Sequence, residues 1–130
     1  MSKSRTLHIE SSKSTPLVDI NTEKQIQLID GVSIPSNARG FYQDVQDMVE
    51  ENFQYFRPDT EFHFRLEYFN TASSKALFNL VKKIHDHMHQ NSGWKIVWKY
   101  EEEEDFMHES GINFQEILET KFEMVKFSPA

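Results

Sequence analysis

The chain contains 130 residues, a length that fits one domain, since domains are commonest at about 100–150 residues. Its 14 Lys and Arg against 21 Asp and Glu leave a net charge of −7, which argues against nucleic acid and anionic membranes as partners. There are no cysteines, so a disulfide framework, a thiolate metal site and a cysteine nucleophile are excluded together. No apolar run approaches the roughly 20 residues of a transmembrane helix, and residues 1–6 lack the apolar stretch of a signal peptide. We therefore expect a single cytoplasmic domain over residues 1–130.

The first half of the chain combines short strand patterns with one helix pattern. Leu7 and Ile9 indicate a short edge strand within residues 1–13, followed by a loop. Segments 17–20 and 24–29 predict a hairpin whose second strand ends at Asp30-Gly31. Apolar residues then recur three and four apart, which predicts a helix that Arg57-Pro58 ends. The residues of this stripe are Phe41, Val45, Met48, Val49, Asn52, Phe53 and Phe56.

The second half begins with a strictly alternating segment, residues 61–68, which predicts a half-buried strand. Its apolar face would carry Phe62, Phe64, Leu66 and Tyr68. A second helix stripe runs through residues 76–88, with an end signal at Asn91-Ser92-Gly93, and residues 94–100 alternate again. We expect a short helix around 104–107, a further turn or helix near 114–118, and a final strand over 122–127.

These elements predict the fold class. Strand, helix and strand over residues 61–100 form a βαβ unit, whose strands should be parallel. Strands covered on both faces have continuous apolar runs, whereas these strands have one polar face. We therefore expect an α/β fold in which a mixed sheet carries its helices mainly on one face.

The turn from the central strand into the second helix is the most informative segment for function. It carries the hydroxyls of Thr71, Ser73 and Ser74 where helix amides lack partners and favour an anion. One interpretation is that a hydroxyl only caps the helix, worth roughly 1 kcal/mol. The other is that phosphate on one hydroxyl controls the docking of a partner. Asn70 would fix the turn through a side-chain bond to the backbone, and Lys75 would pair with phosphate or an acidic partner group.

Two further clusters have weaker signals. His85 and His89 share a helix face and could hold zinc, but HExxH and a third ligand are absent, so a solvated helix end is the simpler interpretation. The acidic run 101–105 lacks the pattern of an EF-hand and indicates a solvated turn that opens a helix, with a partner-docking surface as the alternative. No GxxxxGK[ST], GxGxxG or GxSxG motif occurs, and we expect no active site, metal or cofactor.

Several segments in a fixed order carry a resemblance that covers nearly the whole chain from Ser14-Thr15-Pro16 onward. They are Ser14-Thr15-Pro16, Leu66-Glu67-Tyr68-Phe69-Asn70-Thr71 running into Ser73-Ser74-Lys75, Trp98-Lys99-Tyr100, the acidic Glu104–Gly111 and Phe122. With these segments the chain resembles the SiaC family of bacterial regulatory phosphoproteins. The resemblance implies a single domain with a fold like the STAS domains of anti-anti-sigma factors.

The resemblance also implies a partner-switching role in c-di-GMP signalling and biofilm growth. A kinase of the histidine-kinase-like ATPase type would phosphorylate a threonine, and a PP2C-type phosphatase would remove the phosphate. The unphosphorylated form would bind and activate an effector such as a diguanylate cyclase. The family's Asn-Thr-x-Ser motif places the phosphorylated residue at Thr71, with Ala72 where the family often has Ser. Asn70, Ser73, Ser74 and Lys75 would form the surrounding partner-binding surface.

Two other functions remain open at this point. A small metal-dependent enzyme would use the histidines and acidic residues, and would carry a stoichiometric metal. A constitutive assembly domain would bind through exposed aromatic residues, and phosphorylation would change nothing.

Overall fold

Six strands form one sheet in the order β1-β2-β3-β4-β5-β6 in the computed structural model, which describes residues 4–88 and 93–128. The strands are β1 (Thr6–Ile9), β2 (Leu17–Asn21), β3 (Ile26–Ser33), β4 (Glu61–Phe69), β5 (Lys95–Glu101) and β6 (Glu123–Phe127). The helices are α1 (Ala38–Asn52), α2 (Thr71–Met88) and α3 (Asp105–Leu118), and a 3-10 turn at Phe53–Tyr55 follows α1. Asn91 and Ser92 of the expected end of the second helix lie outside the described residues.

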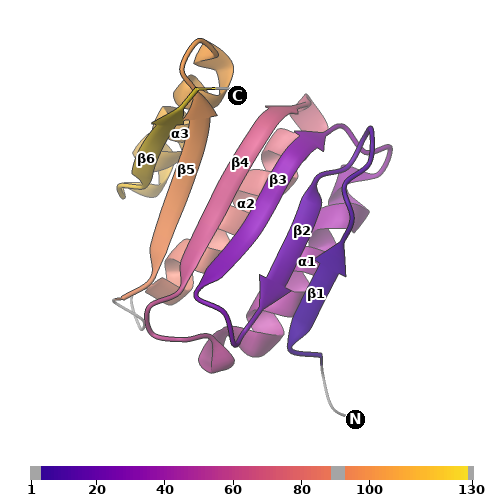
Figure 1. Cartoon of the computed structure of the whole chain (residues 1–130), viewed down its shortest axis with the longest axis vertical. Coiled ribbons are helices and arrows are strands. Elements are labelled where there is room, and N and C mark those ends of the chain that lie inside the picture. Colours follow the sequence, from indigo (N-terminus) through magenta and orange to yellow (C-terminus); the bar gives the residue numbers. More distant parts are fainter. Residues whose placement is uncertain (1–3, 89–92, 129–130) are drawn as a thin grey trace.

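The sheet is mixed, as the sequence predicts. β1, β2 and β3 pair antiparallel, whereas β3, β4, β5 and β6 pair parallel. Each parallel crossover contains one helix, so α1, α2 and α3 all begin at the edge where the carboxyl ends of β3, β4 and β5 lie (Figure 1). This edge is called the carboxyl edge below. None of the helices in the described part is long and apolar enough to span a membrane.

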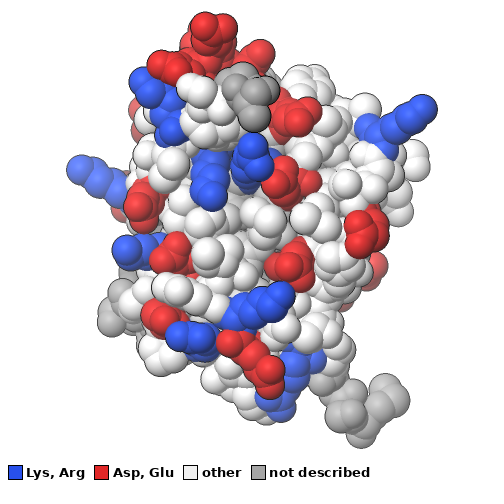
Figure 2. Space-filling view, in the orientation of Figure 1, with Lys and Arg blue, Asp and Glu red and all other residues white. Residues whose placement is uncertain are grey.

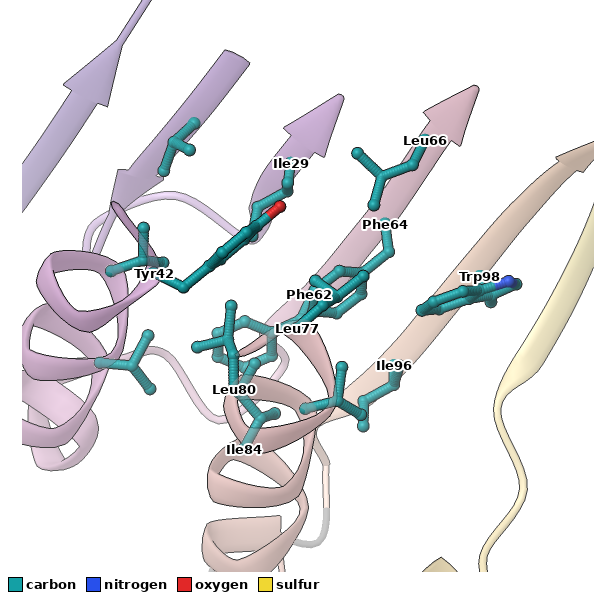
Figure 3. Close-up of a cluster of buried hydrophobic side chains, with 14 of the residues drawn as sticks. Ile29, Tyr42, Phe62, Phe64, Leu66, Leu77, Leu80, Ile84, Ile96 and Trp98 are labelled. Carbon is teal, nitrogen blue, oxygen red and sulfur yellow. The ribbon is translucent and has the colours of Figure 1, made fainter. Parts of the chain in front are cut away.

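The helices pack on one face of the sheet and enclose an aromatic core. Figure 3 shows Phe62 and Phe64 on β4 and Trp98 on β5 directed towards the helical layer. Trp98 is fully buried, its ring lies 5.4 Å from that of Phe114 on α3, and its Nε1 donates to the carbonyl of Met107 at 2.8 Å. The expectation of a mixed α/β sheet with helices mainly on one face is therefore confirmed.

The opposite face of the sheet is polar. Figure 2 shows Lys and Arg interspersed with Asp and Glu over this uncovered face. Cross-strand ion pairs account for part of the pattern, with Arg65 at 3.4 Å from Asp30 and Lys95 at 4.0 Å from Glu123. Arg65 of β4 and Lys95 of β5 thus face solvent among charges of both signs, whereas His63 of β4 is buried.

The structure corrects two predictions about β3 and β4. β3 does not end at Asp30-Gly31, and Tyr68 does not lie on the buried face of β4. β3 continues to Ser33, and the register shifts beside Gly31 so that Glu67 is an extra residue on β4. A bulge of one residue turns the side chains beyond it to the opposite faces. Phe69 is therefore buried in place of Tyr68, which is 49% exposed.

A single helix replaces the two short elements expected between residues 104 and 118. α3 continues through Gly111 without a break. The glycine lies against the indole of Trp98. A Cβ built at this position would lie 2.6 Å from Trp98 Cδ1 and 2.7 Å from Nε1, closer than a methyl group can approach. Gly111 is thus required for the close packing of α3 on β5.

Gly111→Ala should destabilise the fold even though alanine is the better helix former. The helix propensity gain is about 1 kcal/mol, and overpacking against the buried indole costs roughly 1–3 kcal/mol. We expect a net loss of about 1 kcal/mol in the urea-unfolding free energy. The matched control is Asn113→Ala, an exposed position of the same helix, which should be neutral or slightly stabilising. Equal or higher stability of Gly111→Ala would contradict the packing.

Candidate functional site

Asn70 organises the turn between β4 and α2. Its backbone N–H donates to the carbonyl of Ser33 at 3.1 Å, which ties the turn to β3. Its side-chain Oδ1 accepts the backbone N–H of Ser73 at 2.9 Å, and its carbonyl accepts the N–H of Ser74. Asn70 is therefore the N-cap of α2, which confirms the expected side-chain bond to the backbone. The interpretation that Thr71, Ser73 or Ser74 caps the helix is wrong.

A buried hydrogen-bonded cluster lies beneath this turn. The Oγ of Ser33 on β3 lies 2.7 Å from the phenol oxygen of Tyr42 on α1 and donates to Ser73 Oγ on α2 at 3.0 Å. Figure 3 shows Tyr42 reaching from α1 towards the sheet with its oxygen at the tip. All three side chains are buried, and burial raises the pKa of Tyr42 to about 12. The cluster joins the second turn of α1 and the first turn of α2 to the end of β3.

The burial of Ser73 corrects part of the expected binding surface. Its side chain has no exposed area and is bonded to Ser33, so it has no access to a partner. Ser73 supports the turn from below, while Asn70 and Ser74 are half-buried and Lys75 is exposed. The turn therefore presents Asn70, Ser74 and Lys75 outwards, but not Ser73.

Thr71 is the exposed hydroxyl at the first position of α2. It makes no side-chain hydrogen bond to any residue within the described ranges. Because Asn70 caps the helix, the Thr71 hydroxyl is not needed as an acceptor for a backbone N–H. The amino end of a helix accepts negative charge because its first N–H groups have no intrahelical partners. Chemically, the position offers an accessible alcohol whose conversion to a phosphate monoester would not disturb the core.

An exposed aromatic pair flanks this turn and was not predicted from the sequence. Tyr68 is 49% exposed and Phe106 of α3 is 39% exposed, with their ring centroids 5.2 Å apart. Phe106 also contacts the buried Phe69 edge-on at 5.0 Å. The only available sequence signal was Gly31, because an isolated glycine in a strand pattern often marks a bulge.

The histidine and acidic clusters do not form a metal site in the described part of the chain. No group of three or more His, Asp or Glu there is arranged to hold a metal ion, and His89 lies outside the described residues. His85 is half-buried, with its Nδ1 3.9 Å from an oxygen of Asp86. The run 101–105 forms the turn from β5 into α3, and its carboxylates are mostly exposed, as expected for a solvated turn.

Comparison with known proteins identifies the family. The model of the SiaC family of regulatory phosphoproteins matches residues 9–127. The chain belongs to the SiaC family. An uncharacterised protein of Pseudomonas aeruginosa strain UCBPP-PA14 is 26% identical over 110 residues, which cover 85% of this chain and 87% of that protein.

Solved structures share the fold. SiaC of Pseudomonas aeruginosa matches with a TM-score of 0.79 at 24% identity over 99% of this chain and 100% of SiaC. Apo-SiaC from the same organism matches with a TM-score of 0.77 at 25% identity over 98% and 100% of the two chains. SiaC in the crystal structure of the diguanylate cyclase SiaD with its activator SiaC also matches, with a TM-score of 0.79 at 24% identity. That match covers 95% of this chain and 99% of that one.

Replacing Asn70 tests its role as the N-cap of α2. Asn70→Ala removes the acceptor for the Ser73 N–H and should lower the unfolding free energy by about 1 kcal/mol. Asn70→Asp retains the acceptor oxygen and should stay within a few tenths of a kcal/mol of the wild type. Urea unfolding monitored by circular dichroism provides the comparison. Equal losses in both variants would assign the effect to something other than the cap.

The raised pKa of Tyr42 predicts a pH dependence of stability. In the unfolded chain the phenol ionises near pH 10, whereas the folded protein retains its proton up to about pH 12. This stabilisation is complete below pH 10 and is lost as the pH rises towards 12. Between pH 9 and 11 the wild type should lose about 1.4 kcal/mol more unfolding free energy than Tyr42→Phe. Parallel losses in the two proteins, measured by urea unfolding, would contradict the burial of a neutral phenol.

Proposed function

We propose that this protein is a non-enzymatic signalling switch in which phosphorylation of Thr71 controls the binding of an effector. The observation that carries the proposal is the Thr71 hydroxyl, which is exposed and lies in a turn already capped by Asn70. Membership in a family of regulatory phosphoproteins supports a modification of this kind. The unmodified protein would be the binding form.

A diguanylate cyclase is the effector that we propose. The support is the structure in which a protein of the same fold, SiaC, is the activator of the diguanylate cyclase SiaD. A kinase of the histidine-kinase-like ATPase type would transfer phosphate to Thr71, and a PP2C-type phosphatase would hydrolyse it. The chain would thereby act in the cytoplasm, where cyclic dinucleotide signals are made.

The binding surface would be the carboxyl edge around Thr71. Asn70, Ser74 and Lys75 provide polar groups there, and the exposed rings of Tyr68 and Phe106 provide apolar area. Aromatic residues that are half exposed at a rigid site are typical anchors of protein interfaces. A phosphate adds roughly −1.5 to −2 charges at pH 7, which a docked partner would have to desolvate.

Thr71→Ala should abolish phosphorylation while retaining activation of the effector. We expect a phosphatase-sensitive mass increase on the wild-type protein from its own cells and none on Thr71→Ala. Added to purified diguanylate cyclases of the same organism, bare wild type and Thr71→Ala should raise c-di-GMP synthesis equally, and the phosphorylated wild type should not. Thr71→Glu should reduce activation only in part, because one carboxylate carries less charge than a phosphate dianion.

Ser74→Ala is the matched control, since it removes a neighbouring hydroxyl from the same turn. It should be phosphorylated and should activate the effector like the wild type. Full phosphorylation of Thr71→Ala at another residue would show that the site is misassigned. Equal activation by the bare and phosphorylated proteins would instead indicate a constitutive assembly domain. Stoichiometric metal that is lost in His85→Ala would revive the metal-dependent alternative.

A further inference from the structure

A polar groove lies between α1 and α2 beside the candidate site. Its volume is about 440 Å³, and four residues of each helix line it. Arg39, Gln43 and Gln46 line it from α1, and Lys75 and Asn79 line it from α2. Ala72 and Ala76 also line the groove from α2, and their small side chains leave space between the long side chains of Arg39 and Lys75. No carboxylate is among the lining residues.

The two cations of the groove are not neutralised. Arg39 and Lys75 are exposed, and neither forms an ion pair with a residue in ranges 4–88 and 93–128. Other cations do have partners, as in the 2.9 Å contact between Arg57 and Asp59 and the 3.3 Å contact between Lys82 and Asp86. In a chain of net charge −7, a hollow with two unpaired cations and no carboxylate is suited to an anion.

Thr71 directly precedes Ala72, which lines the groove, although Thr71 is not itself a lining residue. Thr71 and Lys75 are four residues apart on α2, so their side chains are neighbours on the helix surface. Arg39 lies in the first turn of α1, three residues before Tyr42, and the buried cluster of Ser33, Tyr42 and Ser73 joins this end of α1 to the first turn of α2. A phosphate on Thr71 would thus be attached at the mouth of the groove, and the two cations would approach it from different helices.

We propose that the α1–α2 groove is an intramolecular binding site for the phosphoryl dianion on Thr71, held by Lys75 from α2 and Arg39 from α1. This inference rests on the proposed phosphorylation of Thr71. The guanidinium of Arg39 donates paired N–H groups to phosphate oxygens, and the ammonium of Lys75 adds a charge-assisted hydrogen bond. The side-chain amide of Gln43 uses one N–H for Asp47 at 2.9 Å, and the amides of Gln46 and Asn79 line the groove as further donors.

Phosphorylation would then change two surfaces together, the turn at Thr71 and the α1–α2 groove. The phosphate adds charge at the turn, and it also draws Arg39 and Lys75 over the groove. Both groups are exposed in the bare protein, where they are available to acidic groups of a partner. The phosphorylated protein would therefore lose its basic groove without a rearrangement of the core.

The test uses the full chain with phosphothreonine incorporated at position 71 during translation, so it requires no kinase. Phosphorus NMR measures the second pKa of the phosphate, which is about 6 for an isolated group. We expect this pKa to be about one unit lower in the wild type than in the double variant Arg39→Gln/Lys75→Gln. Each single variant should lie between them. The side-chain Nε–H signal of Arg39 should also move as the phosphate titrates.

The matched control is Lys24→Gln. Lys24 is an exposed cation without an ion pair in the described part of the chain, and it lies in the β2–β3 turn near the start of β3, away from the carboxyl edge. Its loss changes the net charge by the same amount as either single variant, so the phosphate pKa should match the wild type. A phosphate pKa that is the same in the wild type and the double variant would overturn the proposal, because any shift would then come from the α2 amino end alone.

This result is separable from the proposed function. The pKa comparison asks where the phosphate lies once it is present, whereas mass spectrometry and cyclase activation ask whether Thr71 is modified and whether the modification matters. A kinase that ignores Thr71 would overturn the switch and leave the groove measurement intact. An unshifted phosphate pKa would overturn the groove site and leave the switch intact.

Discussion

The hydrogen bond from Asn70 to the Ser73 N–H is the contact on which the candidate site depends. It gives α2 its cap at the residue before Thr71, so the threonine hydroxyl is not needed to satisfy a backbone donor. Ser73 is directed inwards to Ser33 and Tyr42, which fixes the same turn from below. The turn is therefore held by the residues on both sides of Thr71, and Thr71 itself is left exposed. A modification site needs this combination of a rigid backbone and a side chain that folding does not use.

The periodicities in the sequence were sufficient to predict the fold class but not every strand boundary. The stripes of α1 and α2 and the alternation in β4 and β5 predicted elements that the structure confirms, because burial of one face imposes these spacings. The bulge at Glu67 was missed, since it arises from the pairing of β4 with β3 and the isolated Gly31 is only an indirect local sign of it. The close packing of Gly111 on Trp98 is likewise a tertiary contact that the sequence does not specify.

The same distinction applies to the site. Asn70, Thr71 and Lys75 are close in sequence, so the motif and its capping chemistry were visible before the fold was known. The burial of Ser73 was not, because it depends on Ser33 and Tyr42 from two other elements. Arg39 and Phe106 lie at the same edge of the sheet as the turn because α1, α2 and α3 all begin at the carboxyl edge. Sequence reasoning thus identified the turn that carries Thr71, whereas the fold supplies the residues around it.

The placement of Thr71 is suited to the proposed switch, because a phosphate there would leave stability almost unchanged while it altered binding. The core face of α2 is formed by Leu77, Leu80 and Ile84, which are buried beneath the helix and distant from its exposed first position (Figure 3). Surface changes away from such packing usually alter stability by no more than about 0.5 kcal/mol. A partner that covers the turn must instead desolvate the dianion, and a penalty of only about 3 kcal/mol corresponds to a roughly 100-fold loss of affinity. If Arg39 and Lys75 hold the phosphate, part of that penalty is offset, but the partner then loses both cations. In either case the proposed switch would operate through surface charge, while the aromatic core beneath Thr71 would stay unchanged.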